Sequence, residues 1–377
     1  MRPERRRPAL RRRRAGGSEA CPTRVSGLLN PSKGVRLSRR SEDDAALVLG
    51  DAQPAVGVGG LPRPRTAATP DPGAAARAGW LEFGRPLAVA PGVSRLTWAL
   101  AEKYLTAWEQ WHEPELRREA GLLEALDVPG VATPSVVATT LNTALYADGK
   151  GWIWMMTQAL PGRPGGPPAD SAQCEAAAVA LAAVHRALAA LPVTLAVRRT
   201  GPVDVIRTAL VTDRPSARGR FAVAIVEEAK AWLSGHLGVL EQSPTQLIHG
   251  DWKLGNLRFE RAAAARVSGA LDFERCSVAP VAIDMVQLLS GALRSPVRRD
   301  VAALTRRLVR RYQLAGGEFV SDEALAVALV AYWLDNWLWL EARLKSGEAR
   351  LSSALARQPA RLAAALRLAR LQGQADS

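Results

Sequence analysis

The pattern of hydrophobic and polar positions divides the chain into three parts. Residues 1–79 show no sustained strand or helix period and are rich in Arg, Pro, Gly and Ala. Residues 80–162 hold short apolar runs bounded by turn residues, which is typical of strands. Residues 163–377 hold longer runs at helical spacing. We therefore predict an α+β protein with a small β-rich part, a larger and mostly helical part, and a disordered N-terminal extension that cannot bury enough apolar surface to fold.

Order is expected to begin near Trp80. The strands predicted after it are separated by short turns and lie at residues 87–98 (strand, turn, strand), 104–108, 134–140 and 151–158. The last of these runs into a Pro- and Gly-rich stretch at residues 161–168, which suits a hinge between two lobes.

One predicted helix carries a carboxylate on its apolar face. Pro114 suits its first turn, and Glu119 falls among leucines that recur at helical spacing: Leu116, Leu123 and Leu126. A carboxylate is costly to bury without a partner. Glu119 therefore has a cationic partner, is partly hydrated, or lies on an ordinary solvated helix face.

The helical part begins with Asp170 as a predicted N-cap. On the helix that follows, His185 shares a face with Leu181 and Leu188, so we interpret it as a core histidine with a structural role. Further helices are predicted at residues 219–235, from Ser321 onwards, and up to about residue 372.

The helix that begins at Ser321 carries four aromatic residues and two acids within residues 332–341. An aromatic stripe at helical spacing is typical of a core. A wall formed by Asp335, Trp337 and Trp339 would also suit a cationic substrate. Both interpretations stay open.

The formal net charge of +14 is concentrated at one end, because residues 1–40 hold thirteen Lys and Arg and only two Glu. Such a tail could contact nucleic acid, but the nearly balanced remainder gives no reason to expect nucleic-acid binding by the folded part. The three cysteines, Cys21, Cys174 and Cys276, lie far apart, which favours a reducing, cytoplasmic compartment over a disulfide framework. The longest apolar runs are too short for a membrane span.

Chemistry-bearing residues gather around residues 247–274. The apolar run Leu247–Ile248 leads into His249 and Asp251, and Asn256 follows five residues after Asp251. A second β-like run, at residues 267–271, delivers Asp272. Carboxylates and a carboxamide from two adjacent loops can handle a proton and hold a divalent cation. Alternatively these residues merely cap turns, which Asp, Gly and Asn favour.

The pattern His-Gly-Asp-x4-Asn, followed by Asp-Phe-Glu, resembles the aminoglycoside phosphotransferase and choline kinase family. The resemblance implies a bilobal, protein-kinase-like fold with an N-lobe at residues 80–162 and a C-lobe at 163–377. It implies Mg²⁺ and ATP, or GTP, as cofactors. It assigns to the site a catalytic base (Asp251), a brace for its loop (His249), two Mg²⁺ ligands (Asn256 and Asp272) and a supporting carboxylate (Asp284).

The resemblance is weaker in the N-lobe. Ser94 lies in a turn similar to the family's phosphate-covering turn, and the backbone from Gln158 to Leu160 would contact the adenine. In the family a strand lysine pairs with the helix glutamate, here Glu119, and holds the phosphates. Thr106 stands in that lysine's place. Positions 103 and 106 of a regular strand point to opposite faces, so Lys103 can replace it only if a bulge intervenes or the strand register differs by one residue.

The leading hypothesis is a small-molecule kinase that phosphorylates a hydroxyl of an amine- or sugar-like acceptor, as a monomer or homodimer. The alternative is a pseudokinase-like binding or regulatory module, and it rests on Thr106. A nucleic-acid-binding protein acting through residues 1–40 is a third hypothesis.

Overall fold

The structure is a computed structural model. It describes residues 69–82, 84–88, 95–166, 171–212, 220–260, 266–293, 301–345 and 351–375. Ser94, Asp170, Cys21 and most of the N-terminal extension lie outside these ranges.

A five-stranded antiparallel sheet forms the β-rich part, with the strand order β1-β2-β3-β5-β4. Its strands are β1 (Leu87–Ala88), β2 (Leu96–Leu100), β3 (Lys103–Glu109), β4 (Leu145–Ala147) and β5 (Trp152–Gln158). Alternation along β3 gives the sheet two different faces. Leu105 and Ala107 pack in a cluster with Trp80, whereas Trp108 belongs to the main core together with Leu116.

The prediction of a strand at residues 134–140 is wrong. Val136 makes only one isolated bridge, to Thr157, and the strand at this edge is instead β4. The reason is competition for β5: β4 pairs with Ile153–Met155, which leaves only the end of β5 for the earlier segment. Val137 N–H still donates to Met156 O at 2.8 Å, so the segment is held beside the sheet without joining it.

Order begins earlier than residue 80. Helix α2 (Pro72–Trp80) lies in the segment expected to be disordered. Asp71 caps it by accepting a hydrogen bond from Ala74 N–H at 2.9 Å, and Pro72 occupies the first turn. Trp80 is buried, and its indole Nε1 donates to Val137 O at 2.7 Å. The composition of the segment did not indicate this helix, because the side chain that holds it to the fold is a single tryptophan at its end.

Helix α3 (Glu113–Ala125) follows the sheet's second hairpin after a short 3₁₀ turn, η1 (Gln110–His112). Leu116, Leu123 and Leu126 are buried, as the spacing predicted, and Leu122 is buried as well. Glu119 is buried with them, at 3% exposure, so it does not lie on a solvated helix face.

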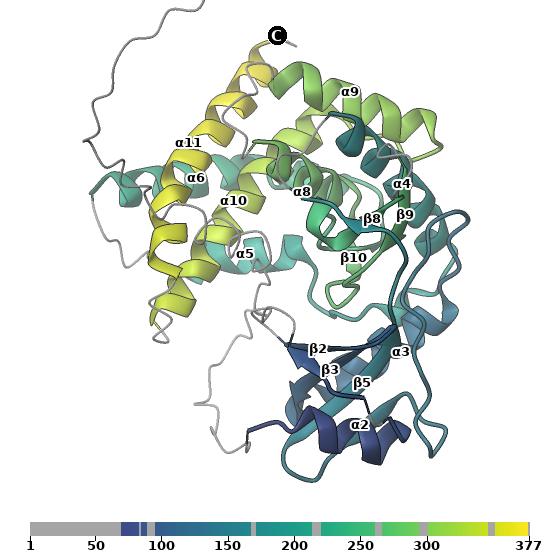
Figure 1. Cartoon of the computed structure of the whole chain (residues 1–377). Coiled ribbons are helices and arrows are strands. Elements are labelled where there is room, and N and C mark those ends of the chain that lie inside the picture. Colours follow the sequence, from purple (N-terminus) through teal and green to yellow (C-terminus); the bar gives the residue numbers. More distant parts are fainter. Residues whose placement is uncertain are drawn as a thin grey trace, which may run out of the picture. The chain divides into compact units, whose positions relative to one another are not determined.

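The helices of the larger part lie side by side (Figure 1), and most of their buried apolar side chains belong to the main core cluster. Its helices are α4 (Ser171–Ala189), α5 (Pro202–Thr212), α6 (Arg220–His236), α7 (Gly238–Gln242), α8 (Ala282–Leu293), α9 (Val301–Leu314), α10 (Asp322–Lys345) and α11 (Ser352–Ala375), with a short 3₁₀ turn, η2 (Val193–Leu195). The predicted helix at 219–235 is confirmed as α6. Ser321 caps α10, because its Oγ accepts a hydrogen bond from Ala324 N–H at 3.0 Å.

Two small sheets lie among these helices. β7 (Thr245–Ile248) pairs with β10 (Ser277–Pro280), and β8 (Leu257–Phe259) pairs with β6 (Arg163–Pro164) and β9 (Val267–Ala270). The predicted strands at 247–248 and 267–271 are therefore present, and the loops that follow β7 and β9 carry the candidate site.

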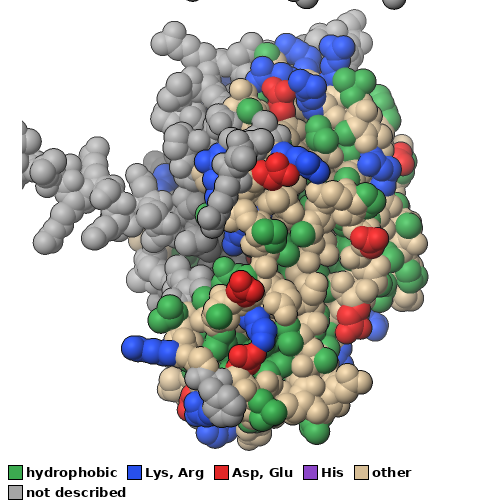
Figure 2. All heavy atoms as spheres, turned by 45° about the vertical axis from the view of Figure 1, so that its right-hand side comes forward, with side chains coloured by type: hydrophobic (Ala, Val, Ile, Leu, Met, Phe, Trp, Pro, Cys, Tyr) green, Lys and Arg blue, Asp and Glu red, His purple; other side chains and the backbone are tan. Residues whose placement is uncertain are grey.

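The charged side chains on the face shown in Figure 2 are scattered, with acidic and basic groups interspersed. Across the helices that the structure describes, none is long and apolar enough to cross a bilayer.

Trp80→Ala tests whether α2 is part of the fold. Removing this buried side chain and its hydrogen bond should destabilise the sheet part by about 3–5 kcal/mol. Leu81→Ala is the matched control, because Leu81 is 64% exposed and its loss should change stability by about 0.5 kcal/mol or less. Urea unfolding of both variants checks this. Equal, small effects would mean that α2 adds nothing to the fold.

Candidate functional site

A tight turn after β7 presents His249, Gly250 and Asp251. Gly250 has φ 80°, and a Cβ added there would lie 2.2 Å from Arg275 O. Only glycine fits, because the position demands both a left-handed backbone and a close approach of another chain segment. The loop after β7 is therefore packed directly against the segment that follows Asp272.

Asp284, in the first turn of α8, binds the backbone of the turn that follows β7. Its carboxylate accepts hydrogen bonds from His249 N–H at 2.7 Å and from Gly250 N–H at 2.8 Å. The His185 Nε2 atom lies 2.9 Å from the same carboxylate, and His185 Nδ1 lies 2.8 Å from the Tyr312 hydroxyl. His185 and Asp284 are thus hydrogen-bonded inside the protein, as a structural role for each of them requires.

Sequence reasoning missed Gln287. Its amide nitrogen donates to Gly250 O at 2.7 Å, and its Oε1 accepts from Trp252 N–H at 2.6 Å. Gln287 lies three residues after Asp284 and hence on the same face of α8. That spacing was the available signal, since two polar residues on one face of an apolar helix require partners.

His249 joins the two loops through its ring. Nδ1 accepts from Asp251 N–H at 3.2 Å, so Nε2 carries the proton and donates to Leu271 O at 2.9 Å. Burial lowers the pKa of His249, against the attraction of nearby carboxylates, which keeps the ring neutral. Both ring nitrogens are engaged with the backbone, so the geometry fits a brace and leaves no free nitrogen for proton transfer.

Asp251 is buried but remains ionised. Burial raises its pKa, yet Lys253 and Arg275 outweigh that effect, and the net pKa shift is downward. Lys253 Nζ lies 2.9 Å from Oδ2, and the Asn256 side-chain amide donates to the same oxygen at 2.8 Å. An oriented carboxylate of this kind can accept a hydrogen bond from an attacking hydroxyl.

Asp272 adopts a left-handed backbone, with φ 71°, which is uncommon for a residue other than glycine. Burial raises the pKa of Asp272 to about 6, and Glu274 and Asp251 add to the rise against the attraction of Arg95. Backbone strain and an unfavourable charge in one residue are typical of a functional site.

Asn256 and Asp272 could hold a divalent cation. Asn256 ends the 3₁₀ turn η3 (Leu254–Asn256), and its backbone oxygen accepts from Leu271 N–H at 2.8 Å, which ties the two loops together. Both side chains offer the hard oxygen ligands that Mg²⁺ prefers when waters and phosphates complete its shell. A cluster of three His, Cys, Asp or Glu side chains suited to a metal does not occur in the described part of the chain.

The cation that reaches Glu119 is Arg95, which the sequence did not single out for this role. Its Nη1 atom lies 3.6 Å from Glu119 and 3.6 Å from Glu274, and its Nη2 atom contacts Asp272. Arg95 directly precedes β2, and its guanidinium lies 5.7 Å from the centre of the Trp108 ring. Carboxylates from α3 and from the loop after β9 thus meet one guanidinium from the sheet.

Lys103 points away from this cluster, as alternation predicted. It pairs with Glu82, on the face of the sheet that α2 covers. Thr106 is buried beside Thr97, with 3.5 Å between their hydroxyl oxygens.

The segment expected to contact adenine begins at Gln158, the last residue of β5. The backbone N–H of Gln158 already donates to Ser135 O at 2.9 Å, and that of Ala159 donates to Glu102 O at 2.7 Å. A contact with a base would therefore fall to the carbonyl oxygens and to Leu160. Ser94, the other expected phosphate contact, lies outside the described residues.

The aromatic helix favours the core interpretation. Trp337 and Trp339 are each 2% exposed, and both belong to the main core, whereas Asp335 is half-buried. A substrate-binding role for these three side chains stays a prediction.

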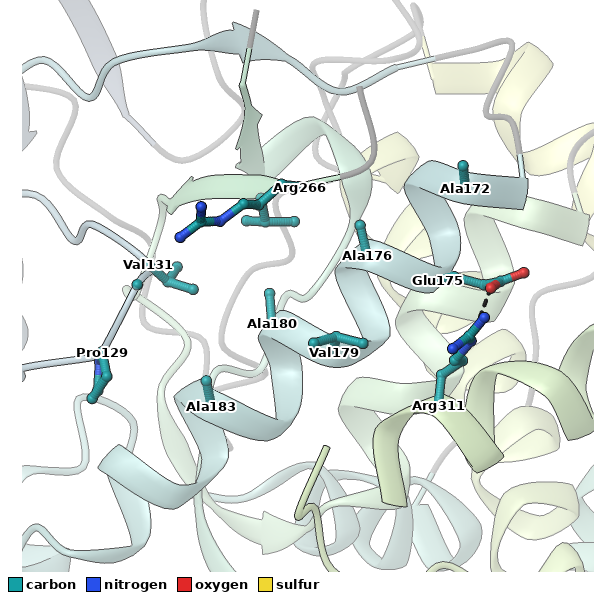
Figure 3. A pocket seen from close by; sticks show the side chains of 12 residues that line it. Pro129, Val131, Ala172, Glu175, Ala176, Val179, Ala180, Ala183, Arg266 and Arg311 are labelled. Carbon is teal, nitrogen blue, oxygen red and sulfur yellow. Dashed lines mark hydrogen bonds and ion pairs between the residues drawn. The ribbon is translucent and has the colours of Figure 1, made fainter. Parts of the chain in front are cut away.

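A separate groove of about 430 Å³ runs along α4. Figure 3 shows Ala176, Ala180 and Val131 facing it, with the Glu175–Arg311 pair at one end. None of the site residues described above lines this groove.

Residues 103–344 match the model of the phosphotransferase enzyme family. The chain therefore belongs to this family and is a phosphotransferase. No protein with a curated description matches the sequence.

Solved structures with a similar fold include small-molecule kinases. An amicoumacin kinase bound to AMP-PNP and Ca²⁺ is 17% identical with a TM-score of 0.59, covering 76% of this chain and 90% of its own. An aminopropanol kinase associated with a microcompartment is 17% identical with a TM-score of 0.57, covering 78% and 93%. The GDP complex of an aminoglycoside 2'-phosphotransferase is 15% identical with a TM-score of 0.55, covering 78% and 93%. The predicted kinase-like α+β fold is thereby confirmed.

The pH dependence of stability should report the buried Glu119. Burial raises its pKa to about 8, against the attraction of Arg95. The folded state then binds a proton more tightly than the unfolded state, whose carboxyl titrates near 4.5. Stability from this group is present at low pH and is lost as the pH rises from about 4.5 to about 8.

Glu119→Gln should therefore weaken the loss of unfolding free energy between pH 5 and pH 8 in the nucleotide-free protein. Urea unfolding at both pH values measures it. Glu124→Gln, an exposed position on the same helix, should keep the wild-type dependence. An unchanged pH dependence in Glu119→Gln would contradict the raised pKa.

Proposed function

We propose that the protein transfers the γ-phosphate of ATP or GTP to a hydroxyl group of a small amine- or sugar-like molecule, with Mg²⁺ as the divalent cation. The observation that carries this proposal is the convergence of Asp251, Asn256 and Asp272 from two adjacent loops. Asp251 and Asp272 are close enough that Asp251 raises the pKa of Asp272, and Arg95 is attracted to both.

The proposed roles follow from the charge states. Asp251, kept ionised by Lys253 and Arg275, orients the acceptor hydroxyl and takes its proton. Asn256 and Asp272 would hold Mg²⁺, which would neutralise charge on the phosphates. His249 and Gln287 keep the loop that carries Asp251 in place.

The acceptor class is inferred from the names of proteins with a similar fold. The names of two similar structures, an aminopropanol kinase and an aminoglycoside phosphotransferase, denote acceptors with amine and hydroxyl groups. The alternative, a binding module without catalysis, rested on Thr106. Arg95 weakens it, because Glu119 has a cationic partner in spite of Thr106.

Asp251→Asn should lower the rate of phosphate transfer by roughly 10²–10⁴-fold, since a positioned base is removed. Binding of Mg·ATP should change little, because Asp251 acts at the acceptor. We would measure phosphate transfer over a panel of hydroxylated amines and sugars, and nucleotide binding by calorimetry. Asp204→Asn, at an exposed aspartate, is the control. Near-wild-type turnover by Asp251→Asn on any accepted substrate would rule out the base.

Asp272→Asn should remove the Mg²⁺-dependent part of nucleotide binding, because a metal ligand loses its charge. In the wild-type protein, Mg·ATP at 100 times its Kd should stabilise the fold by about 2.7 kcal/mol. Thermal unfolding with ATP, with and without Mg²⁺, separates the two contributions. A variant that keeps the full Mg²⁺-dependent shift would contradict the assignment, and a wild-type protein without any shift would favour the binding module.

A further inference from the structure

The two ends of the Arg95 guanidinium have different partners. The Nη1 end lies between Glu119 and Glu274, at 3.6 Å from each. The Nη2 end contacts Asp272, the proposed metal ligand. The side chain is only 19% exposed, and the Trp108 ring lies against it. One end of the guanidinium thus lies between two buried glutamates, and the other end contacts the carboxylate proposed to hold the metal.

The β2–β3 register explains how Arg95 relates to Thr106. Thr97 is directly opposite Thr106, and Leu96 is opposite Ala107. Continuing this ladder by one residue brings Arg95 opposite Trp108, in accord with its contact to that ring. Residues 95 and 97 of one strand, and 106 and 108 of the next, share one face of the sheet. Arg95 therefore provides a cation on the same face as Thr106, from the neighbouring strand.

We propose that Arg95 is the phosphate-binding cation of this enzyme, held in place by Glu119 and Glu274. This inference rests on the proposed function and identifies the residue that supplies the positive charge missing at position 106. When Asp272 holds a divalent cation, the Nη2 end of Arg95 would be available to bind phosphate oxygens. The Nη1 end keeps its two glutamates, so the guanidinium does not have to leave the site.

The chemistry of the side chain suits this role. A guanidinium presents five N–H donors in a planar fork, so it can hold two carboxylates at one end and a phosphate at the other. Arg95 also stays charged at any working pH, because a guanidinium is not deprotonated in proteins. Lys103, which is paired with Glu82 on the other face, cannot take over the task.

The test compares binding of Mg·ATP with binding of adenosine, which lacks phosphates. Arg95→Met should weaken Mg·ATP binding by roughly 10- to 100-fold, the loss of about one charge-assisted hydrogen bond, and leave adenosine binding unchanged. Adding Thr106→Lys to Arg95→Met should restore most of the Mg·ATP affinity, because the new ammonium would project from the same face of the sheet. Arg117→Met is the control, since Arg117 pairs with Glu113 on the exposed side of α3.

Each result decides the matter. Selective loss for Mg·ATP, with rescue by the double variant, supports the proposal. Equal loss of adenosine and Mg·ATP affinity would overturn it and make Arg95 a structural clamp between sheet and loop. Unchanged or tighter Mg·ATP binding by Arg95→Met would also overturn it, and tighter binding would make Arg95 an inhibitor that occupies the metal ligand. If the wild-type protein binds neither Mg·ATP nor Mg·GTP, the proposed function fails, and the inference fails with it.

Discussion

The buried carboxylate of Asp284 is the constraint on which the site depends. It is fully buried, and it binds the two backbone N–H groups of the turn that carries Asp251. A buried charge of this kind is stable only when its hydrogen bonds are complete. His185 and the turn satisfy it together, so the position of the turn that carries Asp251 and the stability of the surrounding core cannot vary independently.

Next to that support, the site gathers several carboxyl groups around one cation. Asp251, Asp272, Glu119 and Glu274 all attract the guanidinium of Arg95. The carboxylates resist ionisation when they are crowded, as the raised pKa values of Glu119 and Asp272 indicate. Such a cluster is suited to gaining a divalent cation, because the added charge relieves the repulsion. The repulsion that raises these pKa values would then also favour the proposed binding of Mg²⁺.

Sequence patterns predicted the elements that carry strong local signals. The loop after β7, the helix α3 with its buried glutamate, and the histidine of α4 all follow from spacing and composition, because each is determined within about ten residues. The misplaced strand at 134–140 and the unexpected helix α2 depended on contacts with β5 and with Val137, far away in the chain. Local sequence patterns do not determine which of two segments pairs with the edge of a sheet.

The same limit explains why Arg95 was overlooked. Along β3, Thr106 is the residue that stands where a cationic partner of Glu119 is expected. A single strand presents side chains to one face only at alternate positions, so its sequence alone offers no other candidate there. In the folded sheet, the neighbouring strand β2 also presents side chains to the same face. A long arginine side chain that starts on β2 can reach a carboxylate that a β3 side chain would otherwise serve. What the site requires is a positive charge at one place in space, and the fold allows more than one backbone position to deliver it.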